Sequence, residues 1–265
     1  MVLRETVWND GWMYSDVIDL REFYDTSLGL VVRRMVRRQI RLMWPDTRGQ
    51  IILGLGYPTP FLRPFLGEAE RVIACMPAEQ GVTHWPPDGR GLVALSEECE
   101  LPLPDMSVDR VLLVHGLEAT EQLGELMREI WRVLNGSGRL LVVVPNRRSL
   151  WARSDRTPFG HGKPYSGSQL NQMLRQHLFV PERVARALWL PPTRSRFLLS
   201  TAGMWEEVGA RWFQRVAGTV MVEASKQIYQ LSRGKKVRSR RPVLVPVGAG
   251  QPALGGLRRE GEEPG

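Results

Sequence analysis

Short apolar runs alternate with helix-periodic stretches along most of this chain. Apolar runs predict buried strands, because a parallel strand that is covered on both faces is apolar throughout; they occupy residues 50–55, 71–75, 91–95, 110–114 and 139–144. Residues 29–43 and 122–134 have apolar side chains at helical spacing instead. The alternation predicts an α/β fold, a doubly wound and mostly parallel sheet with helices on both faces.

Several local signals refine this prediction. Asn135-Gly136 after the second helix is typical of a helix C-cap. Ser166 and Gln169 have the spacing of a capping box in front of an apolar stripe that begins at Leu170. Residues 218–226 are predicted to form the last strand, and the polar loop 146–166 is long enough to be functional or disordered.

Composition and charge favour one domain followed by a tail. With 265 residues, 43% of them hydrophobic, the chain can bury one substantial core, which we place in residues 1–232. Residues 233–265 contain eight Lys/Arg and three Glu, so +5 of the net charge of +8 lies there. We therefore predict a disordered, basic, Pro/Gly-rich tail rather than a nucleic-acid-binding body.

The sequence also bears on compartment and metal content. Cys75 and Cys99 are the two cysteines, and their spacing does not predict a zinc site. No apolar run reaches 18 residues, and the first 20 residues lack the pattern of a signal peptide. A cytoplasmic protein without a membrane span is the expectation.

Two segments in the middle of the chain carry a family resemblance. Residues 100–118 read ELPLPDMSVDRVLLVHGLE, and residues 132–139 read RVLNGSGR. In this order and at this spacing they resemble class I S-adenosylmethionine (SAM) dependent methyltransferases of type 11. The resemblance implies a Rossmann-like sheet of seven strands, with an antiparallel last strand and a sixth strand drawn from 180–190. It also implies SAM as cofactor.

The glycine-rich turn of that family is incomplete here. Gly54 and Gly56 match, whereas Ile52 and Pro58 stand where the family has an acid and a third glycine. Met76 stands where the second strand normally ends in a ribose-binding acid, and Gln80 or Glu79 can take over that hydrogen bond. Each lost acid costs about tenfold to a hundredfold in affinity. The alternative is a strand and a rigid turn that bind nothing. Without a Gly-x-Gly-x-x-Gly motif, the sequence disfavours a nicotinamide cofactor.

Other residues receive roles only from the resemblance. Glu97 and Glu98 fall where the family contacts the adenine amino group, and Leu101 falls where an apolar side chain covers the adenine ring. Tyr24 is a candidate lid over the cofactor. The alternative for Glu97 and Glu98 is a pair of solvated surface charges, and the alternative for Leu101 is packing within a turn. For the segment around Tyr24 the alternative is a helix N-terminus capped by Asp25 or Ser27.

Methyl transfer from a sulfonium is a direct displacement, so it needs a base only when the acceptor must lose a proton. His161 lies between two glycines in the loop 146–166; together with His115 and Tyr165 it is a candidate base. A surface histidine is the alternative for His161. The Asp/Asn-Pro-Pro-Tyr/Phe motif of amino-group methyltransferases is replaced by Val114-His115-Gly116-Leu117, which weighs against an exocyclic-amine acceptor of that type.

The leading hypothesis is a SAM-dependent methyltransferase that acts on an unidentified small molecule. A non-catalytic binding or regulatory protein with the same fold is the main alternative. A third hypothesis is an RNA-associated protein that works through its basic tail, although the tail has no aromatic residue for base stacking. For the arginines of residues 29–43 and of the tail, binding to RNA or to an anionic membrane surface is one interpretation. A solvated helix face and a solubilising tail are the preferred interpretation.

Overall fold

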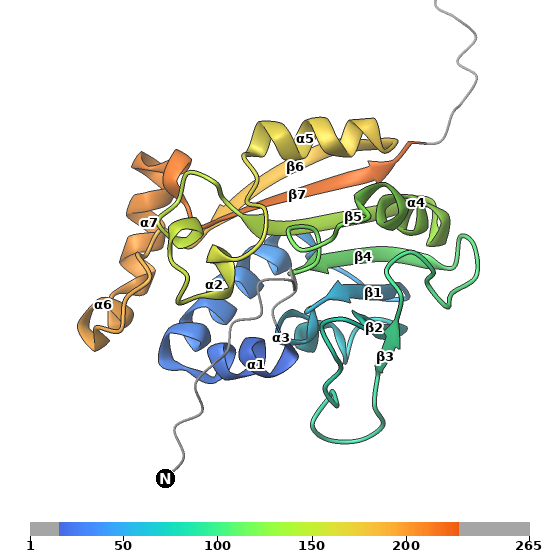
Figure 1. Cartoon of the computed structure of the whole chain (residues 1–265), viewed down its shortest axis with the longest axis horizontal. Coiled ribbons are helices and arrows are strands. Elements are labelled where there is room, and N and C mark those ends of the chain that lie inside the picture. Colours follow the sequence, from blue (N-terminus) through green and yellow to red (C-terminus); the bar gives the residue numbers. More distant parts are fainter. Residues whose placement is uncertain (1–15, 228–265) are drawn as a thin grey trace, which may run out of the picture. The chain divides into compact units, whose positions relative to one another are not determined.

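The computed structural model describes residues 16–227, which form one seven-stranded sheet in the order β3-β2-β1-β4-β5-β7-β6 (Figure 1). The first five strands run parallel, and β7 is antiparallel to both β5 and β6. The strands are β1 Ile51–Gly56, β2 Arg71–Pro77, β3 Val93–Ser96, β4 Val108–Val114, β5 Leu134–Pro145, β6 Phe179–Ala187 and β7 Thr219–Lys226. The predicted α/β class, the seven strands and the antiparallel last strand are confirmed.

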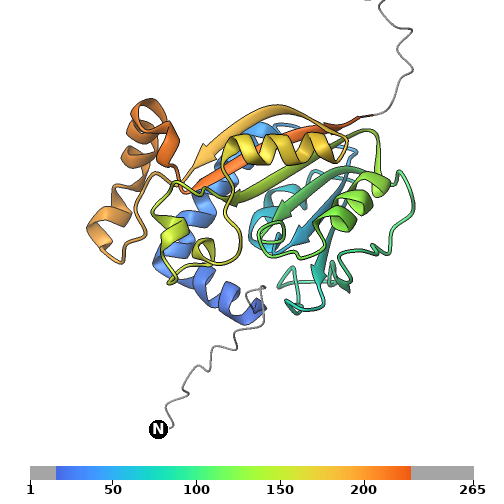
Figure 2. The same ribbon diagram turned by 45° about the horizontal axis from the view of Figure 1, so that its top comes forward.

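Helices cover both faces of this sheet. Figures 1 and 2 show α4 and α5 on one face and α2 and α3 on the other. The α-helices are α1 Val17–Asp25, α2 Ser27–Met43, α3 Thr59–Leu62, α4 Leu123–Val133, α5 Gly167–Gln176, α6 Arg196–Ser200 and α7 Ala202–Trp212. Four 3₁₀ turns complete the described part: η1 Arg63–Phe65, η2 Trp151–Arg153, η3 Pro158–Gly160 and η4 Gln214–Val216.

The central strands contain long apolar runs because their side chains pack into two separate cores. Side chains alternate between the faces of a strand, so Leu112 and Val114 of β4 pack with α2 and α3, while Val111 and Leu113 pack with α4 and α5. All four residues are almost fully buried. This two-sided burial explains why runs without polar alternation formed strands.

Helix ends follow the predicted chemistry in one place and differ in two. The Ser166–Gln169 capping box is present at the start of α5. At the start of α2 the cap is Thr26, whose hydroxyl accepts from the Gly29 amide at 3.0 Å, not Asp25 or Ser27. The predicted C-cap at Asn135-Gly136 is wrong, because Leu134 is already extended and the chain passes directly from α4 into β5.

Residues 1–20 were expected to be irregular or partly helical, and helix α1 occupies Val17–Asp25. The segment between β6 and β7 contains α6 and α7, which were not anticipated from the sequence. The predicted tail, residues 233–265, and the first 15 residues lie outside the described residues.

Residues 16–227 contain neither a membrane-spanning helix nor a metal-binding cluster. None of their helices is both long and apolar enough to cross a bilayer. Within the same residues, no three His, Cys, Asp or Glu side chains are grouped so that they can hold a metal ion.

Candidate functional site

The candidate site lies at the edge where the parallel strands end. Gly56 at the end of β1 is in register with Val114 at the end of β4, and the Tyr57 amide donates to the Val114 carbonyl at 2.7 Å. Gly56 has a φ of +78°, and a Cβ there would lie 2.3 Å from the Val114 carbonyl oxygen. Only glycine fits between these two strand ends.

Gly54 has a packing reason of its own. A Cβ at Gly54 would lie 2.6 Å from the Pro58 side chain and 2.7 Å from Leu62 Cδ1, both on the apolar side of α3. Pro58, which stands in place of the third glycine, therefore packs onto the first. Both glycines are required by the protein's own packing, so they do not by themselves identify a cofactor cradle.

Three buried side chains from distant parts of the chain form a hydrogen-bonded row at this edge. The Tyr24 hydroxyl lies 2.7 Å from His115 Nε2, and His115 Nδ1 lies 3.2 Å from Glu118 Oε1. Tyr24 comes from α1, whereas His115 directly follows β4 with a φ of +52°. This φ lies in the left-handed region of backbone conformation. Non-glycine residues adopt it at a cost in free energy, and such residues are concentrated at functional sites.

The electrostatics of this row fix its proton positions. Burial raises the pKa of Tyr24 well above its usual value, and neighbouring Tyr57 and Glu118 add to the effect. Tyr24 therefore stays protonated and donates to His115 Nε2. The remaining ring proton of a neutral His115 is then on Nδ1, where it points to the Glu118 carboxylate.

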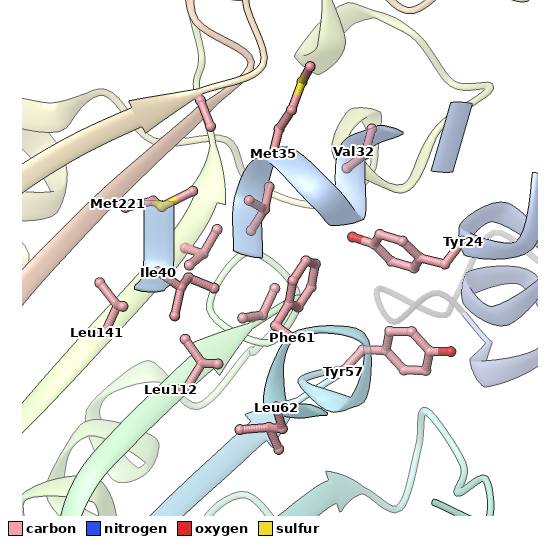
Figure 3. Close-up of a cluster of buried hydrophobic side chains, with 14 of the residues drawn as sticks. Tyr24, Val32, Met35, Ile40, Tyr57, Phe61, Leu62, Leu112, Leu141 and Met221 are labelled. Carbon is pink, nitrogen blue, oxygen red and sulfur yellow. The ribbon is translucent and has the colours of Figure 1, made fainter. Parts of the chain in front are cut away.

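Aromatic rings enclose the row. The Tyr24 ring stacks on Tyr57 with centroids 5.9 Å apart and an interplanar angle of 19°, as Figure 3 shows at the margin of the buried cluster. The Phe159 ring lies 5.0 Å from the His115 ring, and Phe61 meets Tyr24 edge-on at 5.6 Å. These contacts hold the imidazole in one orientation.

Two polar atoms beside His115 have no partner. Gln80 Oε1 and Glu118 Oε2 are buried and accept no hydrogen bond among the described residues, while Gln80 Nε2 donates to the His115 carbonyl at 3.4 Å. A buried acceptor without a donor costs about 1–3 kcal/mol. Both residues line a cavity of about 10 Å³, room for about one water molecule, whose lining is Gln80, His115, Glu118, Ala119, Pro158, His161 and Gly162.

A second cavity of about 10 Å³ lies where the resemblance places adenine. Its lining is Leu55, Gly56, Cys75, Pro77, Ser96, Glu98, Leu101, Leu113 and Leu126. Burial raises the pKa of Glu98. Leu101 is buried, but Glu97 is exposed and does not line the cavity. Met76, in the position of the ribose-binding acid, is fully buried in the core on the α2 side.

The loop 146–166 closes over the His115 side of the site. The Lys163 amide donates to the Glu118 carbonyl at 2.8 Å, and a Cβ at Gly162 would lie 2.4 Å from the same oxygen. His161 thereby lines the same cavity as His115. Tyr165 is half-buried and lies outside that lining; burial and Glu118 raise its pKa.

The donor and acceptor chemistry of these residues fits SAM in kind. The unpartnered oxygens of Gln80 and Glu118 can accept from the ammonium or hydroxyl groups of the cofactor, and Glu98 with Leu101 offers one acceptor and one apolar wall. The two cavities must widen to admit it. Glu118 was not among the residues predicted, although its position three residues after His115 placed it within reach.

Comparison with known proteins agrees with this geometry. Residues 53–142 match the family model described as "Methyltransferase domain". A "Probable S-adenosylmethionine-dependent methyltransferase" of Mycobacterium tuberculosis (strain ATCC 25618 / H37Rv) is 36% identical over 118 residues, 42% of this chain and 42% of the relative. This chain thus matches less than half the length of that relative.

Solved structures share the fold over more of the chain. A "SAM-dependent methyltransferase, possible histamine N-methyltransferase" from Thermotoga maritima has a TM-score of 0.55 at 16% identity, covering 80% of this chain and 96% of that one. A Burkholderia thailandensis 1,6-didemethyltoxoflavin-N1-methyltransferase with bound S-adenosylhomocysteine has a TM-score of 0.50 at 16% identity, covering 80% and 85%. The cofactor named for these relatives is SAM or its product. Residues 53–142 of this chain are therefore similar to SAM-dependent methyltransferases in sequence, and the described residues have the class I methyltransferase fold.

Proposed function

We propose that the protein transfers a methyl group from SAM to a small-molecule acceptor at the carboxyl edge of β1 and β4. The observation that carries the proposal is the buried row Tyr24–His115–Glu118, with an unpartnered oxygen on Glu118 and another on the neighbouring Gln80. In open α/β sheets ligands bind at this edge. Met76 leaves the ribose hydroxyls without an acid, and we assign their recognition to Gln80.

SAM, when bound, supplies a methyl group on a positively charged sulfur. The acceptor's lone pair forms a bond to the methyl carbon while the carbon–sulfur bond breaks and leaves its electron pair on sulfur. Alignment is the main requirement for this displacement. The rings of Tyr24 and Phe159 restrict the space around His115 and so restrict the direction of approach.

His115 is the base that this arrangement supports when the acceptor carries a proton. In the neutral imidazole Nε2 carries the lone pair, which here accepts the hydrogen bond from the Tyr24 hydroxyl, and Nδ1–H points to Glu118. An acceptor that replaces the Tyr24 hydroxyl meets this lone pair. The carboxylate of Glu118 then stabilises the imidazolium that forms. His161 lines the same cavity and has a positioning role, and Tyr165 has none in this scheme.

Calorimetric titration of the full chain with S-adenosylhomocysteine tests the proposal. We expect saturable binding in the micromolar range, about −8 kcal/mol. Gln80→Leu should weaken it about tenfold, because one hydrogen bond to a hydroxyl is lost. Gln172→Leu, on the exposed side of α5, is the matched control and should leave the affinity unchanged. A folded protein that shows no binding at millimolar concentrations would contradict the proposal.

The alternative of a non-catalytic protein of this fold is favoured by one observation. Each of the two cavities holds about 10 Å³, and Ile52 and Met76 replace the two acids of the family. The titration separates the two functions. The RNA hypothesis rests on the tail, which lies outside the described residues.

A further inference from the structure

A larger pocket opens on the other side of Tyr24. Its volume is about 470 Å³, within the range of small-molecule sites. Tyr24 and Tyr57 form its wall toward His115, and the rest comes from α1, α2, the α3 region and the segment 83–87. We call it the arginine pocket; it is lined by Arg21, Tyr24, Asp25, Arg33, Arg37, Tyr57, Thr59, Pro60, Arg63, Thr83, His84, Trp85 and Pro87.

The positive charge of this pocket is not neutralised. Arg33, Arg37 and Arg63 form no ion pair with a carboxylate within 4.0 Å in the part of the chain that the structure describes. Asp25 is the one acid in the lining, and it lies 4.0 Å from Arg21. Four arginines therefore face one carboxylate.

Arg37 shows how closely these cations approach one another. Its Nε donates to the Pro60 carbonyl at 2.6 Å, which holds the half-buried guanidinium in place. Burial lowers the pKa of Arg37, and the positive charges of Arg33 and Arg63 add to this effect. Together they bring the pKa to about 10. Like charges held together without a counter-ion destabilise a fold, so their presence indicates a ligand that neutralises them.

The other walls are aromatic. The stacked rings of Tyr24 and Tyr57 and the indole of Trp85, all three largely buried, line the pocket together with the guanidinium groups. Guanidinium groups bind phosphate and carboxylate oxygens with paired hydrogen bonds, and aromatic walls bind planar rings. The pocket thus combines the two features that recognise an aromatic anion.

We propose that the arginine pocket binds the methyl acceptor, and that the acceptor is a small aromatic molecule with a phosphate or carboxylate group. Tyr24 connects the two sites, because its ring lines the pocket while its hydroxyl lies 2.7 Å from His115 Nε2. The acceptor atom forms the bond to the methyl carbon, the sulfur keeps the electron pair, and an acceptor proton passes to His115 Nε2. The acceptor role rests on the proposed function; the binding of the anion does not.

Titration of the full chain with phenyl phosphate, phenol and inorganic phosphate tests this inference. Phenyl phosphate should bind at least tenfold more tightly than either part alone. Arg33→Gln and Arg63→Gln should each lower its affinity by about tenfold or more, the loss of one charge-assisted hydrogen bond. Arg34→Gln is the matched control, since Arg34 neighbours Arg33 on α2 but does not line the pocket.

Several outcomes would overturn the inference. Phenyl phosphate that does not bind, or that binds wild type and both variants equally, would do so. Single-stranded RNA that binds far more tightly, and is weakened as much by Arg34→Gln as by Arg33→Gln, would show that the whole face of α2 recognises a polyanion instead.

The two proposals fail separately in this design. Arg33→Gln and Arg63→Gln should retain wild-type affinity for S-adenosylhomocysteine, because neither residue lines the cavities at His115 and Glu98. Cofactor binding without phenyl phosphate binding overturns only the acceptor class. Phenyl phosphate binding without cofactor binding overturns the methyltransferase activity, and the acceptor role with it, but not the binding of an aromatic anion in the arginine pocket.

Discussion

Two groups of arginines in this protein have opposite electrostatic surroundings. In the Glu223 cluster, Arg110, Arg139 and Arg183 converge on one fully buried carboxylate, with nitrogen–oxygen distances of 3.2, 3.6 and 2.6 Å. In the arginine pocket, Arg33, Arg37 and Arg63 converge on a cavity of about 470 Å³, and none of the three has a carboxylate of residues 16–227 within ion-pair distance. The residue type is the same, and only the partner differs.

The Glu223 cluster is structural. Glu223 also accepts from Trp44 Nε1 at 2.8 Å, and Arg110 bonds Gln50 at 2.8 Å, so α2, β1, β4 and β7 are tied to one charge centre. The arginine pocket ties nothing of this kind together. We infer that the arginines of the Glu223 cluster are neutralised by a carboxylate of the protein, whereas those of the arginine pocket are neutralised by a ligand.

The largest expected effect comes from removing the shared carboxylate charge. Glu223→Gln leaves three arginines without a counter-ion at a buried point, so the free energy of unfolding should fall by about 3 kcal/mol, the lower end for such pairs because the arginines reach solvent. Urea unfolding measures it. Glu182→Gln, which removes a half-exposed partner of Arg139, should cost about 0.5 kcal/mol. Equal losses of unfolding free energy in Glu223→Gln and Glu182→Gln would contradict the structural role that we assign to the buried Glu223 carboxylate.

The next effect is stabilisation by ligand. At ten times its dissociation constant, phenyl phosphate should raise the free energy of unfolding by about 1.4 kcal/mol, which shifts the melting temperature by about 3–5 °C. The Arg33→Gln, Arg63→Gln double variant should lose this shift while its unliganded stability is equal to or above that of wild type. A double variant that melts well below wild type would show that these arginines stabilise the fold.

The smallest effect concerns the titration of a pocket wall. Burial raises the pKa of Tyr57 from 10 to about 12, while Arg21 and Arg33 counteract part of the shift. The unfolded chain therefore loses this proton first, so stability falls as pH rises from 10 to 12. Arg33→Gln should raise the Tyr57 pKa further, whereas Arg34→Gln should not; ultraviolet titration of tyrosinate measures both. A lower Tyr57 pKa in Arg33→Gln would contradict the placement of Arg33 beside it.

Sequence patterns predicted the fold better than the site. Apolar runs predicted the central strands because burial on both faces of the sheet leaves no polar position. The family motifs predicted that the last strand, β7, is antiparallel. Asn135-Gly136 misled the helix boundary, since the Asn135 side chain instead bonds Asp109 across to β4. The helices α6 and α7 were not predicted, because large apolar residues such as Phe197 and Trp212 are exposed there and the helices therefore lack an amphipathic pattern.

The site depends on contacts that no local pattern contains. His115 was predicted as a base, but its hydroxyl partner Tyr24 lies 91 residues away. Gly54 and Gly56 were matched by motif, yet their spatial reasons are Pro58 and the Val114 carbonyl. The arginines of α2 were interpreted as a solvated face. Two of them, Arg33 and Arg37, line a pocket together with Tyr57 and Arg63, and this pocket depends on packing between elements.

The central claim is that the arginine pocket and the His115 site are two ends of one active site. A crystal structure of the full chain with S-adenosylhomocysteine and phenyl phosphate tests it most directly. The account predicts the phosphate in ion-pair contact with Arg33 and Arg63, and the cofactor sulfur between Gly56 and His115, with the phenyl ring beside Tyr24. Phosphate bound away from these arginines, or a cofactor absent from the strand edge under saturating conditions, would contradict it.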